Sequence, residues 1–111
     1  MRDAVVAAYK QPKATEADQA ARKAAIQHAL RRATDVPLGV MRLSAMGLGH
    51  AKAVAAHGHQ AASSDVGVAV ALLKAGLQGA RLNVEINLDG LSDAAYTEAV
   101  GAEAERLAST T

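Results

Sequence analysis

The sequence predicts an all-α fold, a bundle of about five helices, and three observations support this prediction. Half of the 111 residues are hydrophobic, and most of these are Ala, Leu and Val. Aromatic residues make up 2% of the chain, with two tyrosines and no Phe or Trp. Small aliphatic side chains favour closely packed helices over a thick β core. The length suits one unit, so we expect residues 1–111 to form a single helical domain.

The first two predicted helices are separated by a proline turn. The first runs from the start of the chain to about Tyr9 and ends before Gln11-Pro12-Lys13, because a proline disfavours helical geometry in the residue before it. Thr15 is placed to cap the second helix, with Asp18 three residues later as a weak form of the capping box. We expect this second helix to end near Thr34.

A proline, a glycine and two capping residues predict three further helices. Pro37 starts or kinks a third helix that ends near Ala56, where His57-Gly58 supplies a glycine suited to a left-handed cap. The fourth helix spans Ser64–Leu88, and Asp89-Gly90 marks its end. Ser92 is expected to cap the fifth helix, whose last three residues should fray.

The fourth helix is apolar on nearly all sides until Arg81 and Glu85. Helices of this kind are normally covered all round. Counting by fours along it gives a stripe of small residues that ends in two amides: Gly67, Ala71, Ala75, Gly79, Asn83 and Asn87. A stripe of small residues lets another backbone come close. We therefore expect this helix to be central, and the bundle to be completed by self-association or by a missing half.

Composition argues against several classes of protein. With no cysteine there is no disulfide framework and no thiolate metal site, which favours a cytosolic compartment. The start of the chain does not open a signal peptide, and the apolar run Val66–Leu77 is too short to span a membrane and contains Lys74. A net charge of +1 gives little support for nucleic acid binding. His57 and His59 lack an acidic ligand cluster, so we expect no metal site.

Two blocks of residues carry a resemblance to a known family. The downstream block consists of Gly58-His59, Ser64-Asp65, Gly67-Val68-Ala69, Gly79-Ala80, Asn83-Val84, Ile86-Asn87-Leu88 and Asp93. The upstream block consists of Asp3-Ala4-Val5, Pro12-Lys13, Thr15, Arg22, Ile26-Gln27 and Val36-Pro37-Leu38. In order and spacing both resemble the cyclodeaminase/cyclohydrolase family, which acts on one-carbon derivatives of tetrahydrofolate. The resemblance implies an all-α dimer, a tetrahydrofolate derivative as substrate, and no metal or tightly bound cofactor.

Two departures from the family pattern limit what the resemblance implies. Family members are roughly twice as long, and their first half carries a proline- and glycine-rich loop that this sequence lacks. The chain therefore resembles the C-terminal half of the family's domain. At the second departure, His59 stands where the family usually has asparagine, and Ala61 replaces a further asparagine found in some members.

The candidate site residues come from this resemblance together with their chemistry. The one-carbon unit of such a substrate is an electrophilic, amidinium-like cation. A carboxylate can hold the cation and accept a proton, and amides or an imidazole can orient water and the pterin edge. Asp65 and His59 are therefore the candidate catalytic residues, and the candidate substrate-binding residues are Ser64, Asn83, Asn87 and Lys13.

Each candidate has a structural alternative. Ser64-Asp65 before an apolar run is typical of a helix cap, and Asn83 and Asn87 are typical of amides bonded to a neighbouring helix. Lys13 after a proline is typical of a solvated charge. Three functions stay open: a methenyltetrahydrofolate cyclohydrolase, which we favour because the proline turn and following helix look more like the stand-alone bacterial proteins; a formiminotetrahydrofolate cyclodeaminase; and a non-catalytic dimerisation or interaction module.

Overall fold

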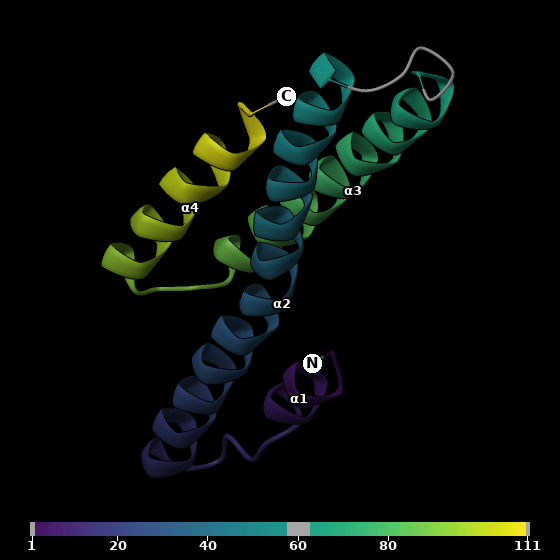
Figure 1. Ribbon diagram of the computed structural model, residues 1–111. Coiled ribbons are helices and arrows are strands. Elements are labelled where there is room, and N and C mark those ends of the chain that lie inside the picture. Colours follow the sequence, from purple (N-terminus) through teal and green to yellow (C-terminus); the bar gives the residue numbers. More distant parts are fainter. Residues whose placement is uncertain (1, 58–62, 111) are drawn as a thin grey trace.

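The computed structural model describes residues 2–57 and 63–110, which form four α-helices. These are α1 (Arg2–Tyr9), α2 (Glu16–His57), α3 (Ser63–Asp89) and α4 (Ala94–Ala108). This part of the chain contains no strand, so the prediction of an all-α fold is confirmed. Figure 1 shows α1 beside the N-terminal half of α2, and α3 and α4 beside its C-terminal half.

The long helix α2 is the centre of the arrangement. Among the described helices it alone packs against all three others, whereas α3 packs against α2 and α4. The expectation that the fourth predicted helix is central was therefore wrong. The small-residue stripe of α3 is exposed from Gly67 to Asn83, because no other element of the described chain packs on it.

The prediction of a helix boundary between Thr34 and Pro37 was also wrong, because α2 runs through Pro37 as one helix of 42 residues. Proline has no amide proton, so the carbonyl of Ala33, four residues earlier, loses its usual helical donor. The side-chain Nδ2 of Asn87 on α3 donates to that carbonyl instead, at 3.1 Å. A neighbouring helix thus satisfies the acceptor that a proline would leave unpaired, and four helices form instead of five.

The start of α2 follows the predicted cap. The Asp18 N–H donates to the Thr15 hydroxyl oxygen at 3.0 Å, and the helix begins at the next residue, Glu16. This bond satisfies one of the free amides of the first turn. The predicted end of the first helix at Tyr9 is likewise confirmed.

Helix α4 is capped by Asp93 instead of Ser92. The Asp93 carboxylate accepts the Tyr96 N–H at 3.2 Å, as an N-cap should. The backbone N–H of Ser92 donates to Oε1 of Gln27 at 2.8 Å, and Nε2 of Gln27 donates to the Gly90 carbonyl at 3.0 Å. One glutamine on α2 therefore holds both sides of the turn between α3 and α4, and this fixes where α4 begins.

The two ends of α3 lie within one residue of the prediction. The helix begins at Ser63, so Ser64 and Asp65 occupy its first turn, where a carboxylate interacts favourably with the helix dipole. It ends at Asp89. The predicted glycine cap at Gly58 lies outside the described residues.

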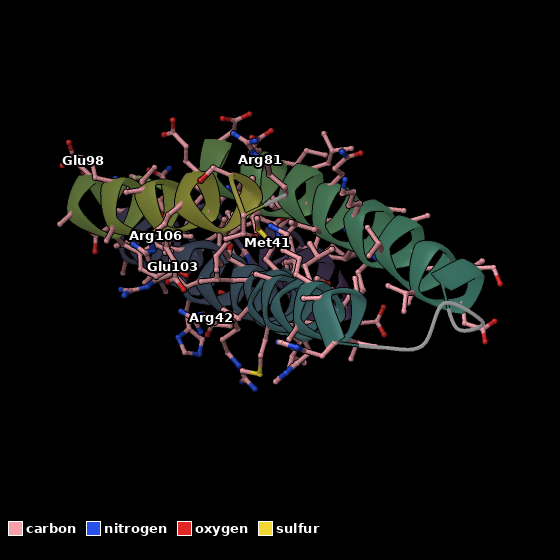
Figure 2. The ribbon with its side chains drawn as sticks, turned by 45° about the horizontal axis from the view of Figure 1, so that its top comes forward. Met41, Arg42, Arg81, Glu98, Glu103 and Arg106 are labelled. Carbon is pink, nitrogen blue, oxygen red and sulfur yellow. The ribbon has the colours of Figure 1, made fainter. Side chains whose placement is uncertain are left out.

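The core is divided into two clusters along α2. The larger one joins α2, α3 and α4, and its members are Leu38, Met41, Leu48, Leu77, Ala80, Val84, Leu88, Val100 and Ala104. Met41 and Val84 are fully buried at 0% exposure, and Met41 lies at the middle of the bundle (Figure 2). The smaller cluster joins α1 to the first part of α2 through Ala8, Ile26, Ala29 and Leu30. Burial of each large side chain stabilises the fold by about 1.5–3 kcal/mol.

The molecule is elongated and thin. Its principal dimensions are 67 × 25 × 13 Å, and its radius of gyration is 18.5 Å. The shortest dimension is close to the diameter of one helix with its side chains, about 10–12 Å. A layer of this thickness cannot cover both of its faces with its own residues. None of the described helices has an apolar stretch long enough to cross a bilayer.

Candidate functional site

A groove of about 540 Å³ lies where α1, α2 and α3 meet. Its walls are Val5 and Val6 from α1, Ala33, Val36, Pro37 and Val40 from α2, and Gly76, Ala80, Asn83 and Asn87 from α3. Asn83 and Asn87 are the two polar side chains among these lining residues, and none of the lining residues is charged. The volume falls within the usual range for small-molecule sites, and apolar walls with a few polar groups are typical of such sites.

Helix geometry places both asparagines in this groove. Asn83 and Asn87 are four residues apart on α3, so they lie on the same side of the helix, one turn apart. Asn87 is half-buried and its Nδ2 is bonded to the Ala33 carbonyl, whereas Asn83 is exposed. Asn87 therefore has a structural role beside the proline, and Asn83 presents the amide that is available to a ligand.

Asp65 and Ser64 lie at the opposite end of the same helix. Both are exposed in the first turn of α3. Eighteen residues separate Asp65 from Asn83, which corresponds to roughly 27 Å along a helix, and Asn87 is about 33 Å away. Within one chain, the candidate carboxylate and the candidate amides therefore do not come together.

Lys13 is not among the residues that line the groove. Lys13 is exposed between α1 and α2, where its backbone carbonyl accepts a hydrogen bond from Nε2 of Gln19 at 3.2 Å. His59 lies outside the described residues. Across the described part of the chain, no three His, Asp or Glu side chains gather as a metal site would require.

A second polar cluster lies where α4 begins. The Arg31 guanidinium sits 4.2 Å from the centre of the Tyr96 ring and 3.7 Å from the Asp93 carboxylate. The Tyr96 hydroxyl lies 3.4 Å from both the Arg31 carbonyl and the Asp35 carboxylate. Burial, followed by the negative charge of Asp35, raises the pKa of the Tyr96 phenol above its usual value. Because these groups pair with one another around an N-cap, they join α2 to α4 and leave no open site.

Sequence reasoning missed the apolar walls of the groove. Val36 and Val40 are 52% and 42% exposed although they lie in the middle of the longest helix. Both belong to a series at spacings of four and three residues, Val36, Val40 and Leu43, and this series could have been found in the sequence. The expected break at Pro37 divided it between two helices, and this concealed it.

The chain is similar to known proteins over most of its length. A family model described as formiminotransferase-cyclodeaminase matches residues 2–106. A methenyltetrahydrofolate cyclohydrolase of Methylorubrum extorquens is 48% identical over 96 residues, which is 86% of this chain and 46% of that protein.

Two formimidoyltransferase-cyclodeaminases are also similar. The protein of Dictyostelium discoideum is 36% identical over 86 residues, which is 78% of this chain and 16% of that protein. The protein of Sus scrofa is 38% identical over 94 residues, which is 85% of this chain and 17% of that protein. The chain thus spans about half the length of the cyclohydrolase and less than a fifth of the two longer proteins. Because the family match extends over nearly all of the sequence, the chain belongs to the formiminotransferase-cyclodeaminase family.

Proposed function

We propose that this chain acts in tetrahydrofolate one-carbon metabolism, in the cytoplasm, as a methenyltetrahydrofolate cyclohydrolase-like protein. The single observation that carries the proposal is the groove, whose two polar lining side chains are Asn83 and Asn87, both predicted from the sequence to bind substrate. The 48% identity to a protein named methenyltetrahydrofolate cyclohydrolase supports the choice of reaction.

The proposed substrate suits the chemistry of the groove. A pterin ring is flat, with apolar faces and an edge of hydrogen-bond donors and acceptors. The valines of α1 and α2 would contact the ring faces, and the Asn83 amide, with one donor group and one acceptor oxygen, would pair with the edge.

The proposed reaction is addition of water to the one-carbon unit of 5,10-methenyltetrahydrofolate. The carbon lies between two nitrogens and shares their positive charge, so it is electrophilic. Water adds to it, a proton leaves the attacking oxygen, and cleavage of one carbon–nitrogen bond gives 10-formyltetrahydrofolate. Asp65 is the proposed group that holds the cation and accepts the proton, with His59 as the proposed group that orients water.

Binding should be tested by isothermal titration of the chain with 5-formyltetrahydrofolate. We expect micromolar binding, and Asn83→Ala should weaken it about fivefold, the equivalent of one lost hydrogen bond of about 1 kcal/mol. Asn83 is exposed, so the variant should fold normally. Gln78→Ala is the matched control, since Gln78 is an exposed amide on α3 that does not line the groove. Failure of the well-folded chain to bind would overturn the proposal.

Catalysis requires a separate assay, the loss of methenyl absorbance. Asp65→Asn should lower turnover by about a hundredfold or more, the usual contribution of a general base, with little effect on binding. His59→Ala should lower turnover without unfolding the protein. If both variants hydrolyse the substrate as fast as the wild type, Asp65 and His59 have no part in the chemistry.

Two alternatives have specific support. The formimidoyltransferase-cyclodeaminase relatives favour the cyclodeaminase reaction, in which a substrate nitrogen attacks a formimino carbon and ammonia leaves. Ammonia release from 5-formiminotetrahydrofolate would identify it. The roughly 27 Å between Asp65 and Asn83 favours a non-catalytic interaction module, or a site completed by a second copy or a separate N-terminal half. A well-folded oligomer that binds no folate would identify the interaction module.

A further inference from the structure

Among the described residues, two polar side chains are buried in the core, Thr34 and Ser44, and both belong to α2. Thr34 is 0% exposed, and its hydroxyl donates to the Leu30 carbonyl at 2.7 Å. Ser44 is 7% exposed, and its hydroxyl forms no hydrogen bond within the described part of the chain. Buried hydroxyls are normally paired, because desolvation without a partner is costly. The Ser44 hydroxyl therefore keeps its donor and its acceptor capacity for a molecule outside the chain.

The Ser44 hydroxyl faces Gly76 of α3, which lines the groove. A Cβ at Gly76 would lie 3.5 Å from the Ser44 Oγ, at ordinary van der Waals distance. Ser44 is not itself a lining residue, since it lies behind the backbone of Gly76 as seen from the groove. Because glycine has no side chain, the groove is open toward this hydroxyl, and a larger residue at position 76 would cover it.

Two contacts between α2 and α3 place this hydroxyl along the groove. At one level Asn87 donates to the Ala33 carbonyl, and at another Gly76 faces Ser44. Eleven residues separate the two levels on each helix, so the helices run antiparallel in one continuous register. The two levels are therefore roughly 16 Å apart along the helix axes.

The groove has a polar group toward each of its ends. The lining residues of α3 begin at Gly76, and one turn earlier Leu73 packs on Gly47, where a Cβ would lie 3.0 Å from the leucine Cδ2. Ser44 is thus at the level where the groove ends. Asn83, whose amide is exposed, lies seven residues from Gly76, or about 10 Å along α3.

We propose that the Ser44 hydroxyl is a second hydrogen-bonding group for the ligand of the groove, and that Gly76 keeps it accessible. The identity of the ligand, a reduced folate, rests on the proposed function. A pterin has two fused rings with hydrogen-bonding groups on both. With a hydrogen bond at each end it spans about two turns of a helix, which is the separation of Asn83 from the level of Ser44. The Asn83 amide then binds one ring and the Ser44 hydroxyl binds the other.

Alkylation of a cysteine at position 44 tests access from the groove without any ligand. The chain contains no cysteine, so Ser44→Cys supplies a single thiol. We expect iodoacetamide to label it in the folded protein, and the added substitution Gly76→Ala should slow labelling about tenfold by covering the thiol. Thr34→Cys is the control, because position 34 is 0% exposed and should react as the protein unfolds. Labelling of Ser44→Cys as slow as that of Thr34→Cys would overturn the proposal.

Isothermal titration with 5-formyltetrahydrofolate tests whether the ligand uses the hydroxyl. Ser44→Ala should weaken binding about fivefold, the equivalent of one neutral hydrogen bond. Its Tm should be unchanged or raised, since no described residue loses a partner. Unchanged affinity would overturn the proposal, and a lowered Tm would assign the hydroxyl to the fold instead.

Gly76→Ala should weaken binding by a similar factor, because the added methyl group covers the Ser44 hydroxyl. Gly79→Ala is the matched control on the same helix. Gly79 is exposed outside the groove, and a Cβ there would meet nothing within 4 Å. Both substitutions replace glycine by alanine in a helix, so their effects on helix propensity are equal.

The double variant of Ser44→Ala and Gly76→Ala distinguishes covering the hydroxyl from filling the groove. If the methyl group acts by covering the hydroxyl, Gly76→Ala has no further effect once Ser44→Ala has removed that hydroxyl. An equal loss of affinity in both backgrounds would mean that the methyl group fills the groove, and would overturn the role of Gly76. If the wild type binds no folate, the proposed function fails, while the labelling rates still decide whether the groove reaches Ser44.

Discussion

The Asn87 side chain donates a 3.1 Å hydrogen bond from Nδ2 to the backbone carbonyl of Ala33. Ala33 lies four residues before Pro37, so its carbonyl is the acceptor that the proline cannot serve. One amide on α3 therefore allows α2 to continue through a proline. The same contact joins the two helices beside the groove.

Asn87→Ala should destabilise the protein by about 1–3 kcal/mol, because a half-buried carbonyl loses its partner. In a Pro37→Ala background the loss should fall below about 0.5 kcal/mol, since the substituted residue has a backbone N–H that restores an ordinary helical bond to the Ala33 carbonyl.

Urea unfolding of the wild type, the two single variants and the double variant measures the coupling between Asn87 and Pro37. Equal losses in both backgrounds would show that Asn87 does not compensate for the proline. Gln78→Ala is again the control, because it removes an exposed amide from the same helix without removing such a bond.

The ion pair between Arg42 and Glu103 should make stability depend on pH. Arg42 Nε and Nη2 donate to the two Glu103 carboxylate oxygens at 2.6 and 2.7 Å, where α4 lies against α2 (Figure 2). These hydrogen bonds lower the pKa of Glu103 below its ordinary value of 4.5. A lowered pKa in the folded state means that the pair stabilises the fold above pH 4.5 and is lost as the pH falls through the folded-state pKa.

Glu103→Gln should therefore lower the Tm at neutral pH, and its difference from the wild type should shrink in acid. Thermal unfolding from neutral pH to below the pKa of Glu103 measures this difference. Glu98→Gln is the matched control, because Glu98 lies on the other side of α4 (Figure 2) and should give a small change. A constant difference for Glu103→Gln across the range would contradict the interpretation.

Tyr96 should ionise at higher pH than an ordinary tyrosine. Burial and the nearby Asp35 raise the pKa of its phenol above the ordinary value of 10.0. A phenol whose pKa is raised by folding contributes stability that is complete below pH 10.0 and is lost as the pH rises through the folded-state pKa.

A Tyr9→Phe variant leaves Tyr96 as the remaining tyrosine, so its ionisation can be followed by tyrosinate absorbance. The midpoint should decrease when Asp35→Asn removes the negative charge beside the hydroxyl. An unchanged midpoint would show that Asp35 does not act on Tyr96.

Gly90 should be the least replaceable glycine among those described. A Cβ at this position would lie 2.9 Å from Cδ1 of Leu30, a buried residue of the smaller core cluster. Gly90→Ala should cost about 1–3 kcal/mol, the usual range for overpacking. Gly49→Ala should instead stabilise α2 by about 0.5–1 kcal/mol, because alanine is the better helix former and the site is open. Urea unfolding compares the two variants, and equal effects would contradict the packing argument.

Local rules predicted most of the helix boundaries. The end of α1 at Tyr9, the Thr15 cap and both ends of α3 depend on residues close in sequence, and so they could be found there. The continuation of α2 through Pro37 depends on Asn87, fifty residues later, and no local rule anticipates a donor from another helix.

The N-cap of α4 also depends on a residue that is distant in sequence. Ser92 and Asp93 are both good N-cap residues, and local preference does not separate them. The Ser92 N–H donates to the Gln27 side chain, which holds Ser92 in the turn, so Asp93 becomes the N-cap of α4. The partner is again distant in sequence.

The candidate site was predicted in part. Helical spacing was sufficient to put Asn83 and Asn87 on one side of α3, and the groove contains both. The distance between Asp65 and the two asparagines could also have been calculated from the helix length. Residue chemistry alone, however, does not show whether these side chains meet within one chain. The predicted catalytic roles of Asp65 and His59 remain predictions, and so do the substrate-binding roles of Ser64, Asn83, Asn87 and Lys13.

The short helix α1 forms one wall of the groove and has few buried contacts. It supplies Val5 and Val6 to the groove, yet among the described helices it packs against α2 alone, through the buried Ala8 and through Arg22, whose Nε donates to the Tyr9 carbonyl at 3.2 Å. Elements with so few buried contacts open at a free energy well below that of global unfolding. Detachment of eight residues would therefore expose the groove from one side while the larger cluster stays intact, and amide exchange in α1 should be faster than in the middle of α2. The rate at which a ligand enters would then depend on how tightly α1 packs on α2, and substitutions at Ala8 would change it.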